Sequence, residues 1–228
     1  MPLAFSARLD GTQATRHFSV SLTIFFLRQA QAQCIAAANA TDGEEAFKQS
    51  LTSIIYCCMF LEAFANEWAE NKYSGEELER FIQQRKEFAA EDGISKATAK
   101  LRSLFRNFWS VDLEVTDSPL REIEELFTLR NEMIHYKVSK SAGKILLKAG
   151  EVQISPMGYV VNFNVTGPVV ETEDPLFASV NVRTAVNSYN AALELALMWN
   201  EKAGAPSDAL GAFTPLSMEK RPSGMQKW

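Results

Sequence analysis

Residues 129–137 read LRNEMIHYK and bring three chemically capable side chains onto one predicted helix. Arg130 keeps its positive charge at neutral pH and offers a planar fork of N–H donors to phosphate oxygens. His135, five positions later, belongs to the residue type whose charge changes near neutral pH, so it can take up or release a proton. Asn131, one turn before His135, could orient either the imidazole or a bound phosphate. Together these side chains could bind a phosphate group and move a proton beside it.

An ordinary solvent-exposed helix face is the alternative interpretation of the same residues. An arginine followed five positions later by a histidine arises easily by chance. Arg106-Asn107 repeats the first two residues of the motif, but Val111 stands where the histidine would be. The spacing alone therefore does not distinguish a catalytic pair from a solvated surface. The polar stripe in question follows helical spacing and consists of Glu124, Thr128, Asn131 and His135.

Glu62 is the next candidate, because it lies in the apolar stretch FLEAFANE at residues 60–67. A carboxylate buried there without a partner would be strongly unfavourable. Pairing with Arg130 would satisfy it and would hold the guanidinium ready for a phosphate. The alternative is a Glu62 side chain that faces solvent, which is the commoner case for glutamates.

Two segments, at 93–111 and 134–150, carry basic residues but no acidic ones. The chain as a whole has a net charge of −5, which argues against a general binder of polyanions. Local basic segments could still attract phosphates, although ordinary solvated lysines are the alternative. The first segment contains Lys96, Lys100, Arg102 and Arg106, and the second contains Lys137, Lys140, Lys144 and Lys148.

The composition is that of one soluble globular domain, with 228 residues, 46% hydrophobic and 22% charged. Three cysteines, at 34, 57 and 58, show no metal-ligand spacing. No metal or cofactor is therefore predicted, and a reducing cytoplasm is favoured. Residues 16–40 imitate a signal peptide, but Asp10 and Arg28 interrupt the pattern; export remains an alternative. No apolar run is long enough to span a bilayer, so no membrane association is expected.

Helical periodicity predicts helices over 17–40, 43–71, 74–92, 95–109, 118 to about 139–143, and 181–202. Ser74 with Glu77 resembles a capping box, and Ser118 before Pro119 resembles a helix start. EVQIS and YVVNFNV around a PMG turn predict a β-hairpin at about 145–165. Residues 1–204 should thus form one mainly α domain, a helical bundle with a β-hairpin inserted before its last helix. Residues 205–228 should form an extended or mobile tail.

The stretch LFTLRNEMIHYK resembles the signature of the HEPN superfamily (higher eukaryotes and prokaryotes nucleotide-binding domains). That signature is an arginine followed, after four to six residues, by a histidine late in a bundle helix. IIYCCMFLEAFANEWAE is similar to the family helix with an acidic residue, which corresponds to Glu62 with Asn66 nearby. Some members carry a tyrosine two positions after the histidine, whereas here Tyr136 follows directly as a supporting residue. The resemblance covers residues 17–140 and the closing helix.

The resemblance implies a HEPN-like bundle that cleaves RNA without a metal ion. The RNA 2′-OH would attack the adjacent phosphate, with His135 transferring a proton and Arg130 stabilising the developing charge. Such domains pair so that two motifs face each other, which implies a homodimer with RNA as its partner. A toxin or antiphage-defence effector, with a neutralising protein partner, is the implied role. The alternative is a catalytically inactive HEPN-like module that serves dimerisation or RNA binding.

Overall fold

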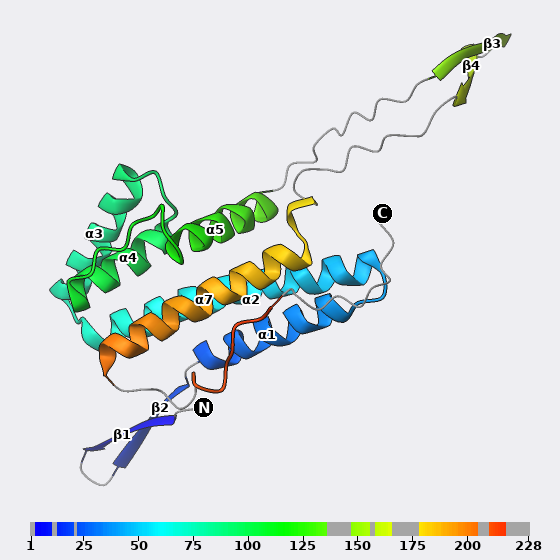
Figure 1. Cartoon of the computed structure of the whole chain (residues 1–228). Helices are drawn as coiled ribbons and strands as arrows, with labels where there is room; N and C mark the ends of the chain where they lie inside the picture. Colours follow the sequence, from blue (N-terminus) through cyan, green and yellow to red (C-terminus); the bar gives the residue numbers. More distant parts are fainter. Residues whose placement is uncertain are drawn as a thin grey trace.

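The computed structural model describes residues 3–10, 13–20, 22–135, 147–155, 158–165, 178–204 and 210–217. Within these ranges the chain is mainly helical, as predicted, and also has two pairs of strands (Figure 1). The elements are β1 (Leu3–Asp10), β2 (Gln13–Val20), α1 (Thr23–Asn39), α2 (Gly43–Lys72), α3 (Glu76–Glu91), α4 (Lys96–Trp109), α5 (Leu120–Ile134), β3 (Leu147–Ser155), β4 (Gly158–Val165) and α7 (Val182–Ala203).

The long helices α1, α2 and α7 lie side by side and form the body of the bundle (Figure 1). α5 packs against α2 and α7, while α4 contacts both α2 and α5, and α3 packs on α4. α1 contributes Leu27, Ala30 and Cys34, all 0% exposed, so the apolar run that imitates a signal peptide is part of the core. In the described ranges, no helix is both long and apolar enough to cross a membrane.

α7 contributes Trp199, the largest fully buried side chain of the described residues. Trp199 is 1% exposed and lies against rings of α2 and α4, with centroids 4.9 Å from Trp68 and 5.1 Å from Phe105. Aromatic contacts of this kind contribute stability beyond the apolar area that they bury. Val182 is only partly buried. The predicted core face is confirmed for the other residues of that face, which are at most 4% exposed: Val186, Tyr189, Leu193, Ala196 and Trp199.

The N-terminal part of the chain differs from the prediction of a helix from residue 17. β2 occupies residues 13–20, where it pairs antiparallel with β1, and α1 begins only at Thr23. The apolar run that starts at Phe18 therefore belongs partly to β2 and partly to α1. The prediction of one continuous helix over this run was wrong. Apolar residues at every second position from Leu3 to Leu9 carried the strand signal.

The start of α3 was predicted one residue too early. Its N-cap is Gly75, at φ 51°, and no side chain caps the helix. The predicted capping box of Ser74 with Glu77 is absent, because Ser74 offers only its carbonyl to the Glu77 N–H, at 3.1 Å. By contrast, the helix start predicted at Ser95 is confirmed: the Ser95 hydroxyl accepts from the Thr98 N–H at 3.1 Å.

α5, the helix of the candidate motif, is shorter than predicted at both ends. Its N-cap is Pro119, without a side-chain cap, in place of Ser118. It ends at Ile134, well before the predicted end near 139–143. Met133 is its last residue packed against the core, whereas Ile134 is 61% exposed. Burial of an apolar face supplies most helical stability in proteins, and this burial decreases at the end of α5.

β3 and β4 lie in the segment for which the sequence predicts a hairpin. The two strands pair antiparallel, with an irregularity of register between Ala149 and Val152. Alternating apolar residues in YVVNFNV fall within β4, as a strand period requires.

Residues 210–217 of the predicted tail are docked on α7. Leu210 and Phe213 are each 7% exposed. The Asn190 side chain makes hydrogen bonds with both backbone polar groups of Leu216. The Leu216 N–H donates to Asn190 Oδ1 at 2.8 Å, and Asn190 Nδ2 donates to the Leu216 carbonyl oxygen at 2.9 Å. This part of the tail forms no helix or strand, and its buried apolar residues and the hydrogen bonds to Asn190 hold it against α7.

Asn190→Ala should lower the free energy of unfolding by about 1–3 kcal/mol, since it leaves two backbone groups of Leu216 without partners. It should also speed proteolysis within 205–217. Urea unfolding and limited proteolysis would measure these effects. Asn187→Ala, at an exposed position of the same helix, is the matched control and should change stability by less than about 0.5 kcal/mol. Equal stability of both variants would contradict the docking.

The three cysteines should resist thiol reagents while the protein is folded. Their exposure is at most 3%, and burial raises the pKa of Cys34 to about 11 and that of Cys58 to about 12, from 9.0. The thiolate, which is the reactive form, is therefore scarce in the native state. Labelling with a disulfide reagent at pH 8 should modify all three only after denaturation. Rapid native labelling of two or three thiols would contradict this packing.

Candidate active site around Arg130

Arg130 lies where α5 meets α2 and forms an ion pair with Glu62. Its Nη2 is 3.5 Å from Glu62 Oε1, and the two side chains are 33% and 43% exposed. The pairing that the sequence suggested is therefore present, at the edge of the core and open to solvent. Cys58, one turn before Glu62, is buried, which raises its pKa, while the charges of Arg130 and Glu62 act on it in opposite directions.

Asn131 gives the guanidinium of Arg130 a second anchor. Arg130 Nη1 donates to Asn131 Oδ1 at 3.1 Å. A guanidinium has five N–H donors, so these two contacts leave others with no partner among the described residues. The Asn131 side chain thus contacts the arginine, whereas only its backbone carbonyl contacts His135, whose N–H donates to it at 3.0 Å.

His135 is the C-cap of α5 and is exposed. Five positions correspond to about 140° around a helix, so positions 130 and 135 lie on different sides of α5. Among the described residues, no hydrogen bond or ion pair joins the imidazole to Arg130 or Glu62. The sequence suggested that the guanidinium and the imidazole act on the same phosphate. Within one chain, these contacts do not bring the two groups together.

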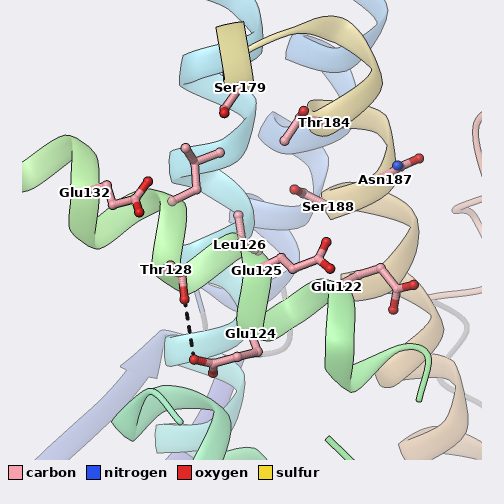
Figure 2. Close-up of a pocket in the computed structure, with 11 residues that line it drawn as sticks. Glu122, Glu124, Glu125, Leu126, Thr128, Glu132, Ser179, Thr184, Asn187 and Ser188 are labelled. Atoms are coloured by element: carbon pink, nitrogen blue, oxygen red, sulfur yellow. Dashed lines mark hydrogen bonds between the residues drawn. The ribbon is translucent and has the colours of Figure 1, made fainter. Parts of the chain in front are cut away.

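Glu124, from the predicted polar stripe, connects two helices through hydrogen bonds. Both of its carboxylate oxygens accept the backbone N–H of Ser95, at 2.9 and 3.0 Å, which ties α5 to the start of α4. The Thr128 hydroxyl lies 3.5 Å from Glu124 Oε1 (Figure 2). These two residues belong to the packing of α5, and no hydrogen bond or ion pair joins them to Arg130 among the described residues.

An open groove of about 430 Å³ lies between α5 and α7 (Figure 2). Leu126 and Leu129 contribute apolar surface to it, and hydroxyl and amide side chains of α7 face them. No lysine or arginine is among its lining residues, so the groove repels a phosphate chain. Sequence reasoning did not single out this groove. Its acidic lining consists of Glu122, Glu124, Glu125 and Glu132.

The first predicted basic segment is largely engaged in packing. Arg102 pairs with both Asp92 and Asp112, the latter at 3.0 Å. The guanidinium carbons of Arg102 and Arg106 lie 5.2 and 5.3 Å from the centroid of the Phe88 ring. These arginines therefore hold α3 and α4 together. Two carboxylates already neutralise the charge of Arg102, so this residue does not attract phosphates as its segment was expected to.

Lys100, from the same segment, behaves differently. Its Nζ donates to Asn66 Oδ1, which places a lysine one turn along α2 from the Arg130–Glu62 pair. Sequence reasoning noted both residues separately but did not bring them together. The four-residue spacing of Glu62 and Asn66 is the signal that could have done so.

The other predicted phosphate-binding residues cannot be placed in this site. Lys148 is in β3, opposite Asn164, and its side chain lies outside what the structure describes. Within the described ranges, no three His, Cys, Asp or Glu side chains are grouped to hold a metal ion. The remaining predicted site residues lie outside the described residues: Tyr136, Lys137, Lys140 and Lys144.

The Arg130–Glu62 pair should position the guanidinium without adding much stability. Exposed ion pairs typically contribute ~0.2–1 kcal/mol. A double-mutant cycle with Glu62→Gln and Arg130→Gln should therefore give a coupling below about 1 kcal/mol by urea unfolding. A coupling of several kcal/mol would instead identify the pair as a structural element of the core.

No protein-family model, curated protein or solved structure matches this chain. Its function is therefore inferred from side-chain chemistry and from the geometry around Arg130. The arrangement offers a held guanidinium with free donors, an exposed imidazole at the end of the same helix, and a neighbouring lysine.

Proposed function

We propose that this chain is a metal-independent endoribonuclease of the HEPN type. Arg130 and His135 are its catalytic residues, and Asn131 and Glu62 position the arginine. The observation that carries the proposal is the held guanidinium, which Glu62 contacts at 3.5 Å from another helix while Asn131 accepts from it at 3.1 Å. A toxin or defence effector of this kind would act in the cytoplasm and would need a neutralising protein partner.

The free donors of Arg130 suit an RNA phosphate. When the 2′-oxygen attacks the adjacent phosphorus, negative charge builds up on the non-bridging oxygens of the phosphorane. A fixed cation with N–H donors stabilises that charge most where it need not reorganise during the reaction. Glu62 and Asn131 supply such fixation, because they come from two directions and leave the guanidinium one-third exposed.

His135 supplies the proton transfer. It takes the proton of the 2′-OH as the new P–O2′ bond forms, and the P–O5′ bond then breaks. The departing 5′-oxygen needs a proton from a second acid. The products are a 2′,3′-cyclic phosphate and a 5′-hydroxyl, with no water consumed in this step.

A symmetric homodimer would provide the second histidine, since each chain has one in this motif. It would also bring a partner's imidazole towards Arg130, which the contacts within one chain do not do. Large apolar side chains are exposed beside the site: Ile134 at 61%, Ile55 at 43% and Met59 at 38%. Ile55, Met59 and Glu62 follow helical spacing on α2, so apolar surface and ion pair share one face, as a self-associating surface requires.

A catalytically inactive HEPN-like module is the second candidate. The separation of His135 from Arg130 within one chain favours it, because a binding module needs the cation but no aligned imidazole. Such a module would bind RNA or a second copy through the same face and would release no new RNA ends.

The proposal predicts cleavage of cellular RNA in the presence of EDTA, with cyclic phosphate and 5′-hydroxyl ends. His135→Ala should slow cleavage by about 10²–10⁴-fold, the usual contribution of general acid–base catalysis. Arg130→Ala should reduce both cleavage and RNA affinity, because it removes the phosphate donors. Sequencing of the new ends and a gel-based rate assay would measure these changes.

Arg121→Ala is the matched control for Arg130→Ala, since Arg121 is exposed on the same helix and pairs only with Glu122 among the described residues. It should cleave like the unmodified protein. Circular dichroism would establish that each variant is folded. RNA binding without cleavage by the unmodified protein would favour the inactive module. Unchanged cleavage by folded His135→Ala would rule out the proposed chemistry.

A further inference from the structure

We infer that Lys100 and Arg85 extend the Arg130 site into a phosphate-binding track, which holds the backbone of single-stranded RNA beside the phosphate at Arg130. This inference rests on the proposed action on RNA and adds the path of the substrate. The track follows a stripe of α2 whose members are spaced by four residues: Glu62, Asn66 and Glu70.

Lys100 is the middle of the track. It reaches from α4 to α2, where its Nζ donates to Asn66 Oδ1. Partial burial is the main reason why the pKa of Lys100 is lowered, and the charge of Arg85 lowers it further, whereas Glu70 and Glu62 raise it. The ammonium group therefore has one hydrogen-bond partner, Asn66, and the charges of Arg85, Glu70 and Glu62 act on it.

Arg85, on α3, is a cation that the described residues leave without a partner. Its Nε is buried and unbonded, and no ion pair joins it to a described carboxylate. It nevertheless lies near a second cation, Lys100. Two neighbouring cations repel each other in a partly buried place, and an anion between them turns this repulsion into attraction. A phosphate oxygen would also accept a charge-assisted hydrogen bond from the buried Nε of Arg85.

Glu62 connects this pair of cations to the catalytic arginine. It contacts Arg130 Nη2 at 3.5 Å, and its charge also acts on Lys100. Arg130 contacts Glu62 and Lys100 contacts Asn66, four residues further along α2. Four residues advance a helix by ~6 Å, so the two cations contact successive turns of α2. Three cations here face two carboxylates, Glu62 and Glu70, and the track is net positive on a chain of net charge −5.

The surroundings restrict a polyanion to this path. On α5, the groove towards α7 is lined by four glutamates and repels phosphates. On α4, the nearby Arg102 is neutralised by Asp92 and Asp112. By contrast, no ion pair joins Lys100 or Arg85 to a carboxylate of the described residues.

Binding of a 2′-O-methylated RNA 12-mer tests the track separately from cleavage, because its 2′-oxygens cannot attack. Its dissociation constant would be measured between 50 and 200 mM salt. Each lost phosphate contact on a single strand should reduce the slope of log K against log salt by about 0.7. Lys100→Gln and Arg85→Gln should each show this loss, and the double variant should lose about 1.4.

Lys86→Gln, at an exposed position next to Arg85, is the control of equal charge change. It should keep the slope of the unmodified protein. Glutamine at 100 retains a donor for Asn66, and Arg85→Gln breaks no described contact, so a thermal melt should find both variants folded.

Three results would overturn the track. They are no binding by the unmodified protein, unchanged slopes in both variants, or an equal loss in Lys86→Gln, which would indicate nonspecific attraction. Unchanged slopes with intact cleavage of ordinary RNA would remove the track and leave the ribonuclease standing. Altered slopes without any cleavage would remove the ribonuclease and leave the track standing, since the track would then belong to an RNA-binding module.

Discussion

The burial of Trp199 is the contact on which the arrangement of the other helices depends. Its ring meets aromatic side chains of α2 and α4 at once, with centroids 4.9 to 5.8 Å away. α7 thereby sets the distance between α2 and α4, and α5 packs onto the same group of helices. The face of α2 that carries Glu62 and Asn66 is in this way brought under Arg130 of α5 and Lys100 of α4.

α5 separates two surfaces of opposite character. Towards α7 it contributes glutamates to an open groove, and towards α2 it contributes Arg130. An acidic chain can attract a polyanion only through such a separation, because a uniform distribution of its charge would repel the ligand everywhere. If the proposed function holds, the helix that supplies the candidate catalytic arginine would thus also limit the direction from which RNA could approach.

The contacts of Arg130 are suited to orientation more than to stability. Its pairing with Glu62 is exposed to solvent, where screening keeps the energy of an ion pair small. The hydrogen bond to Asn131 adds direction, and other N–H donors of the guanidinium have no partner among the described residues. His135, at the end of α5, does not share these contacts. A complete acid–base site would therefore require a second chain, and the exposed Ile134, Ile55 and Met59 offer the surface for it.

Local signals in the sequence determined the helices that bury one long apolar face and the start of α4 at Ser95. They offered the Arg130–Glu62 pair only as one of two alternatives, beside a Glu62 side chain that faces solvent. They misplaced the ends of α5 and the start of α1, because helix ends depend on where burial stops. Only the tertiary structure decided that Glu124 caps α4 and that residues 210–217 dock. It alone brought Lys100 and Arg85 together beside Glu62, because contacts between residues distant in the chain leave no periodic trace in it.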